Sequence, residues 1–200
     1  MIFLSRKTIL QSALEYGSDV LGLDATFNVS YYKNVCLFAI VGRSNGGAMP
    51  LGYFVSSSKG EVAVTKGLQM FIEEVHIALR EGGSLTNDEV YHPQAFCIDK
   101  DEAEHAAIRN VFPGSTIILC HYHFMTLICN ELKSLKYSLG STSRKCAIDT
   151  VRRLSTATSD DEYHSALASL KNISSSFYNG YFAKNYLNER WKYAITEVNR

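Results

Sequence analysis

The sequence predicts an α/β domain with a mixed five-stranded sheet, followed by a segment that contains helices alone. Three strand-like runs come first with short turns between them, which favours antiparallel pairing. Two further apolar runs are separated by helical patterns, which favours parallel strands joined by helices. Beyond Gly140 the pattern is helical only.

Composition is that of a folded protein. Of the 200 residues, 46% are hydrophobic, and 12 Tyr and 10 Phe can fill a core, while only three prolines argue against a disordered chain. The formal net charge is zero, so charge does not indicate a nucleic-acid binder. Residues 1–140 hold 11 basic and 14 acidic side chains, and residues 141–200 hold 9 and 6. The weakly positive segment 141–200 could face a phosphate backbone, or its charge could be ordinary surface variation.

Cysteine usage and the absence of long apolar runs predict an intracellular protein. The number of cysteines, five, is odd and their spacing is irregular, which is typical of reduced thiols. The apolar start, residues 1–4, is too short for a signal peptide. No apolar run approaches the length of a membrane span.

The N-terminal half begins with a helix and three strands. Residues 1–17 look helical and are expected to pack on the edge of the domain. The three strand candidates are 20–30, 34–43 and 49–57, and the turns between them are 31–34 and 44–48.

A helix is predicted over 61–80, because its apolar residues recur at helical spacing, and Gly82 ends it. A second helix begins at Asp101, which has the spacing of a capping box with Glu104. The other predicted elements are strands 94–99 and 116–120 and a helix over 123–137.

This order of elements is that of the ribonuclease-H-like fold, in which the first and fourth strands are neighbours. Asp24 and Asp99 would then approach each other at one end of the sheet. A carboxylate at the end of a buried strand is costly unless it is paired or binds a metal. Two of them can converge on one cation, which suggests metal-assisted chemistry on phosphate esters. Asp24 could instead be a turn or cap residue, whereas Asp101 is better explained as a helix N-cap than as a ligand.

Residues 141–200 read as a helical insertion or an appended helical layer. A capping-box signature at 159–162 precedes an apolar helical pattern. An aromatic-rich stretch follows at 177–193, which we interpret as core, with stacking on unpaired bases as the alternative.

Five short segments carry a family resemblance through their order and spacing. They are Asp24-Ala25-Thr26-Phe27, Met49-Pro50-Leu51-Gly52-Tyr53, Asp99-Lys100-Asp101-Glu102-Ala103-Glu104, Val111-Phe112-Pro113 and Cys120-His121-Tyr122-His123. The chain resembles the catalytic domain of Mutator-like element (MULE) transposases over about residues 10–135.

The resemblance implies a DDE-type transposase that cleaves and joins DNA. Two ions, Mg²⁺ or Mn²⁺, would be held by two aspartates and a glutamate, with Asp24 as the first acid and Asp99 as the second. The expected partners are transposon terminal inverted repeats and target DNA, with a homo-oligomer possible and the nucleus as the location.

The third acid of the family lies in a Thr-Asn-rich stretch beyond the helical insertion. Glu189 and Glu197 are the only glutamates after residue 162, and neither has a matching context. The resemblance therefore implies a core at 1–140 that lacks its last segment and a truncated insertion at 141–200. The chain would be a fragment or a decayed copy.

Cys120 and His123 match the Cys-x-x-His signature of the family. Such a pair can hold zinc, but a structural zinc site needs about four ligands; His121 could be a third, and no fourth is evident nearby. Support of the active site or contact with DNA is favoured over zinc, with core packing as the remaining alternative.

A second class of function stays open at this point. A domesticated transposase-derived protein could bind DNA or regulate transcription without catalysis. The retained Asp24 and Asp99 favour the enzyme, and the missing glutamate favours the domesticated protein. A ribonuclease-H-like nuclease acting on RNA or junctions is disfavoured by the Cys-x-x-His motif and the helical insertion.

Overall fold

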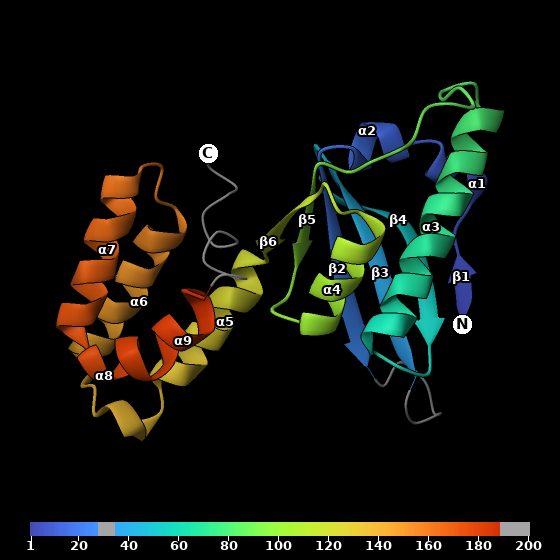
Figure 1. The fold of residues 1–200 in the computed structure, drawn as a ribbon. Helices are drawn as coiled ribbons and strands as arrows, with labels where there is room; N and C mark the ends of the chain where they lie inside the picture. Colours follow the sequence, from blue (N-terminus) through green and yellow to red (C-terminus); the bar gives the residue numbers. More distant parts are fainter. Residues whose placement is uncertain (28–34, 189–200) are drawn as a thin grey trace. The chain divides into compact units, whose positions relative to one another are not determined.

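The computed structural model describes residues 1–27 and 35–188, and it divides into two compact units, residues 1–117 and 118–200 (Figure 1). The first unit holds most of the sheet and helices α1–α4; the second holds helices α5–α9. The predicted domain boundary at residue 140 stays a prediction. Among the described residues, no helix has the length and apolar character needed to cross a membrane.

The sheet is mixed and has the strand order β1-β4-β3-β2-β5-β6. Strands β2, β3 and β4 form the predicted antiparallel meander, and β5 runs parallel to β2. The predicted strand over 94–99 therefore lies in the same sheet as the first predicted strand and next to it. The strands are Ile2–Leu4 (β1), Val20–Phe27 (β2), Cys36–Ser44 (β3), Gly47–Ser56 (β4), Ala95–Ile98 (β5) and Thr116–Leu119 (β6).

The sheet has six strands where the sequence predicted five, because the helix predicted over 1–17 is wrong at its start. Residues Ile2–Leu4 form β1, which pairs antiparallel with the outer edge of β4. Phe3 turns inward, and its ring lies 6.2 Å from that of Phe71. Two short helices follow, α1 (Lys7–Leu10) and α2 (Ala13–Gly17). A three-residue strand is too short to show a period of two in the sequence.

The turn between β3 and β4 is tighter than predicted. β3 continues to Ser44, which pairs with Gly47 at the start of β4, so only two residues form the loop. Gly47 has φ of +128°, a backbone conformation that glycine adopts readily. The predicted turn at 31–34 and the ends of the two strands beside it lie outside the described residues.

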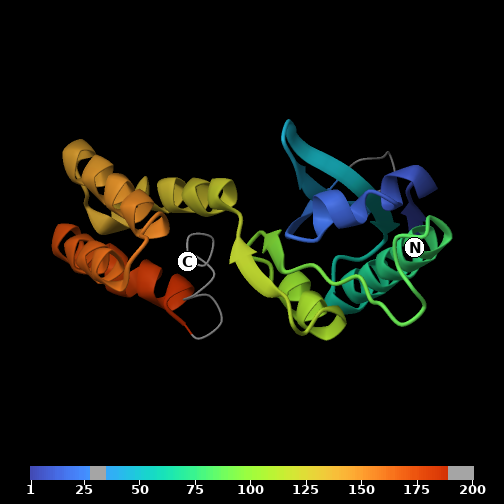
Figure 2. The ribbon, with the colours of Figure 1, turned by 90° about the horizontal axis from the view of Figure 1, so that it is seen from above.

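Helices α3 (Glu61–Glu81) and α4 (Glu102–Val111) pack together on one face of the sheet, as Figures 1 and 2 show from two directions. The side chains between the helices and the sheet are fully buried, among them Phe71 of α3 and Phe96 of β5. The rings of Phe38 and Phe54 stack at 4.5 Å on neighbouring strands. This apolar layer is the core of the first unit.

In the second unit, α5 (His121–Leu132) starts and ends earlier than predicted. Ser134 is extended, with ψ of 134°, and its hydroxyl accepts a hydrogen bond from the backbone of Lys136, which confines residues 135–137 to a separate 3₁₀ turn. The helices beyond it are α6 (Ser141–Ser155), α7 (Asp160–Ile173), α8 (Ser175–Phe177) and α9 (Ala183–Tyr186), with a π-helical turn over Tyr178–Phe182.

Two local sequence patterns predicted features of this unit correctly. Ser159 is the N-cap of α7 and accepts a hydrogen bond from the Glu162 backbone, as the capping-box pattern predicted. The aromatic stretch is core within the described residues, since Phe177, Phe182 and Tyr186 have no exposed surface. Trp191 and Tyr193 lie outside the described residues.

Candidate functional site

Strand pairing gives Asp24 and Asp99 the same register position on neighbouring parallel strands. The last Cα pair between β2 and β5 is Gly22↔Cys97, and each aspartate lies two residues beyond it. Adjacent strands are about 4.8 Å apart. The two residues that the sequence singled out are therefore brought to the same end of the same strand pair, which Figure 1 shows side by side.

Asp24 lies on the solvent-exposed face of the strand pair. Leu21 and Leu23 of β2 are buried, and because side chains alternate along a strand, Asp24 projects to the opposite face, where it is exposed. Asp99 follows the last residue of β5 and is half-buried. The pair can therefore be reached from solvent.

Asp101 is the N-cap of α4, as predicted. Its Oδ1 accepts hydrogen bonds from the backbone N–H of Ala103 at 2.8 Å and of Glu104 at 3.1 Å. These bonds satisfy two of the donors that a helix leaves free at its start. Asp101 thus has a structural task, and Asp99 remains the candidate ligand at the end of β5.

Glu104 is a third acid of this region, and the sequence analysis missed it. It was predicted to complete the capping box, but its side chain is only 4% exposed, and Oε2 is buried with no hydrogen-bond partner among the described residues. A buried polar atom without a partner costs about 1–3 kcal/mol. One signal could have revealed it: Glu104 shares its helix face with the buried Ala107 and Ile108, three and four residues on.

The environment of Glu104 is electrostatically unfavourable for a carboxylate. Burial, and after it the negative charges of Asp101, Asp99 and Asp24, raise its pKa to about 8.

Cys120 and His123 lie in the second unit, at the start of α5. Cys120 is the N-cap residue and is half-buried, and its side chain makes no capping hydrogen bond. His123 is in the first helical turn, with its ring 5.3 Å from the exposed ring of Tyr122. Zinc binding, support of the active site and DNA contact by this pair all stay predictions.

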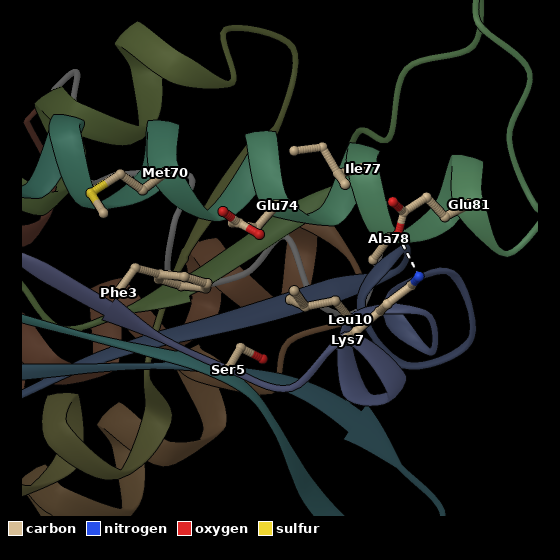
Figure 3. A pocket seen from close by; sticks show the side chains of 9 residues that line it. All are labelled: Phe3, Ser5, Lys7, Leu10, Met70, Glu74, Ile77, Ala78 and Glu81. Atoms are coloured by element: carbon tan, nitrogen blue, oxygen red, sulfur yellow. Dashed lines mark ion pairs between the residues drawn. The ribbon is translucent and has the colours of Figure 1, made fainter.

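A pocket of about 340 Å³ lies elsewhere in the first unit, between α3 and the N-terminal segment (Figure 3). The close-up shows Phe3 and Leu10 of the N-terminal segment opposite Glu74 and Ala78 of α3, with the ion pair between Lys7 and Glu81 at one end. None of the site candidates lines this pocket. An exposed ion pair of this kind contributes little to stability. The pocket is a gap between packed elements.

The donor set at the end of β2 and β5 fits a hard divalent cation. Asp24 and Asp99 offer carboxylate oxygens at the same register position of the two strands. Mg²⁺ and related ions take oxygen ligands, and a positive charge would relieve the repulsion among these acids.

Comparison with known proteins assigns the chain to a family. The family model of the MULE transposase domain matches residues 20–127, just over half of the chain and a span that includes both aspartates and the Cys120–His123 motif. The chain belongs to this family, which confirms the resemblance found in the sequence and indicates a transposase-related function. A search of curated proteins found no match.

Proposed function

We propose that this chain carries the catalytic core of a DDE-type transposase, which cleaves DNA and transfers strands with the help of Mg²⁺ or Mn²⁺. The observation that carries the proposal is the matched register of Asp24 and Asp99 on β2 and β5. Membership of the MULE transposase family supports DNA as the partner. Work on chromosomal DNA would take place in the nucleus.

The ribonuclease-H-like fold is part of this proposal, and the strand order supports it. The first strand of the antiparallel meander, β2, lies beside the helix-linked parallel strand β5. This neighbour relation brings an acid from an early strand to an acid from a late one.

Each side chain has a distinct part in the proposed chemistry. The carboxylates of Asp24 and Asp99 bind and orient the cation, and the exposed position of Asp24 leaves room for a phosphate group. The bound cation supplies Lewis-acid activation of the phosphodiester and of the attacking hydroxyl. Asp101 holds the start of α4 in place and so fixes the segment that follows Asp99.

Metal titration of the 200-residue chain tests the site. Asp24→Asn and Asp99→Asn should each weaken Mn²⁺ binding about tenfold or more, because each removes a charged ligand. Asp88→Asn, at an exposed acid distant in sequence from both, is the matched control and should bind like the wild type. Isothermal titration calorimetry measures the Mn²⁺ affinity of all four proteins. Wild-type affinity in both site variants would rule out the assignment.

A nuclease assay separates the enzyme from a domesticated DNA-binding protein. The proposed function predicts Mn²⁺-dependent nicking of plasmid DNA by a version of the protein that also carries the third acid of the family, and Asp24→Asn and Asp99→Asn should abolish it. DNA binding without cleavage, unaffected by either substitution, would favour the non-catalytic alternative.

A further inference from the structure

A row of four residues leads from Asp24 to the edge of the sheet. Its members are directly paired on β2, β3, β4 and β1, and they are Asp24, Ala39, Tyr53 and Leu4. Directly paired side chains share one face of a sheet, so the whole row lies on the exposed face of Asp24. Two strand spacings place the backbone of Tyr53 about 10 Å from that of Asp24. Ala39, which lies between them, ends in a single methyl group.

The far end of this row borders a hollow of about 280 Å³ between β1, β4 and the start of α1. Leu4 and Tyr53 line it together with Ile9 and Pro50, and Arg6 is the one charged residue of its lining. No residue of α3 takes part, so this hollow is separate from the pocket that the N-terminal segment forms against that helix.

The chemistry of the hollow fits one nucleotide of an unpaired DNA strand. Tyr53 is 37% exposed and Leu4 is 53% exposed, so a ring and an aliphatic side chain are both available to a ligand. Aromatic rings stack on unpaired bases of any sequence, and a guanidinium group such as that of the exposed Arg6 pairs with phosphate. A purely apolar partner would use Tyr53 and Leu4 but would give Arg6 no counter-charge.

We propose that this hollow holds an unpaired base of the DNA strand that binds at Asp24. The inference rests on the proposed function, because that function brings a DNA strand to Asp24. Tyr53 is on the same face and in the same row, so a strand that runs from Asp24 towards β1 reaches it without crossing to another face. The protein should therefore prefer single-stranded or opened DNA to an intact duplex.

The test measures binding of a fluorescein-labelled oligothymidine to the 200-residue chain by fluorescence anisotropy without metal ions. Tyr53→Ala should weaken this binding about tenfold, because one base loses its stacking partner. Tyr53→Phe keeps the ring and should bind like the wild type. Arg6→Ala should lower the slope of log affinity against log salt by about 1. Ile77→Ala, at a half-exposed apolar side chain of α3, is the matched control and should bind like the wild type.

Duplex DNA and the conservative variant separate stacking from other causes of weak binding. A duplex with the same label should bind Tyr53→Ala like the wild type, because its bases are paired and covered. An equal loss for the duplex, or an equal loss in Tyr53→Phe, would overturn the inference. So would unchanged DNA affinity in Tyr53→Ala together with loss of a wild-type dimer in sedimentation, because the occupant would then be a second copy of the chain.

Mn²⁺ calorimetry of the aspartate variants makes the two failures distinguishable. If Asp24→Asn and Asp99→Asn weaken Mn²⁺ binding while a folded Tyr53→Ala binds the oligothymidine like the wild type, the inference is wrong and the proposed site stands. If Tyr53→Ala weakens strand binding but neither aspartate variant weakens Mn²⁺ binding, the proposed metal site is wrong, and the hollow does not belong to it.

Discussion

Two groups in the first unit show how burial decides the protonation state of a side chain. Burial, and after it the negative charges of three aspartates, raise the pKa of Glu104, whereas partial burial and the nearby charge of Arg80 lower the pKa of His76. In Glu104 one carboxyl oxygen, Oε2, is buried without a hydrogen-bond partner among the described residues. In His76 the neutral ring is stabilised, because its Nε2 accepts a hydrogen bond from the Tyr91 backbone at 3.0 Å.

The low pKa of His76 predicts a loss of stability in acid. The unfolded chain binds a proton near pH 6.5, and the folded chain does so only at lower pH, so the unfolded state binds more protons in this window. The free energy of unfolding should therefore have its highest value above about pH 6.5 and fall as the pH drops below it. Urea unfolding at pH 7.5 and pH 5 measures the effect.

His76→Gln keeps an acceptor for the Tyr91 N–H and removes the titration. Its pH-dependent loss should be smaller than that of the wild type, whereas His164→Gln, at an exposed histidine of α7, should behave like the wild type. An identical pH profile for wild type and His76→Gln would contradict the assignment to His76.

At the scale of the element, α3 shows that packing can outweigh helix propensity. Gly67 lies inside this helix, and a Cβ there would meet the ring of Phe54 at 2.5 Å. Alanine favours a helix interior by up to about 1 kcal/mol over glycine. The ring of Phe54 is fully buried and stacked on Phe38, so it has little room to move.

Gly67→Ala should therefore destabilise the protein by about 1–3 kcal/mol, the usual cost of overpacking a core. Val62→Ala, at a position of the same helix that is 84% exposed, should change stability by less than about 0.5 kcal/mol. Thermal or denaturant unfolding gives both values. A gain in stability for Gly67→Ala would mean that the contact with Phe54 relaxes at no cost.

Helix α6 carries most of the positive bias of the C-terminal residues. Its basic residues are Arg144, Lys145, Arg152 and Arg153, and its only acid is Asp149. Lys145 and Arg152 are exposed and seven residues apart, which places them on one helix face. This face is the candidate contact for a DNA backbone under the proposed function.

Lys145→Ala together with Arg152→Ala should weaken binding to DNA of any sequence and reduce the slope of log affinity against log salt by about 2. Lys66→Ala, at an exposed lysine of α3, should leave both unchanged. Fluorescence anisotropy over a salt series measures the slope. An unchanged slope in the double variant would exclude α6 as a backbone contact.

At the scale of the whole molecule, the sequence predicted what repeats over many residues. The antiparallel meander, the two helix-linked strands and the helical C-terminal segment follow from long apolar patterns and turn residues. Strand β1 was missed because three residues carry no period and its pairing with β4 is a long-range contact. Asp24 and Asp99 could be chosen because each ends an apolar run. The burial of Glu104 was missed because its capping spacing was interpreted alone, although it shares a helix face with Ala107 and Ile108.

The parallel pairing of β2 with β5 also affects when the acid pair can exist. Asp24 and Asp99 are 75 positions apart in the chain, and only this long-range pairing unites them. Closing so large a loop is entropically costly, so such contacts form late in folding. A growing chain that has not yet emerged as far as residue 95 can form the meander and α3, but it has no acid pair. Under the proposed function, such a nascent chain cannot yet hold a cation between the two acids, and the site exists only after β5 has joined the sheet.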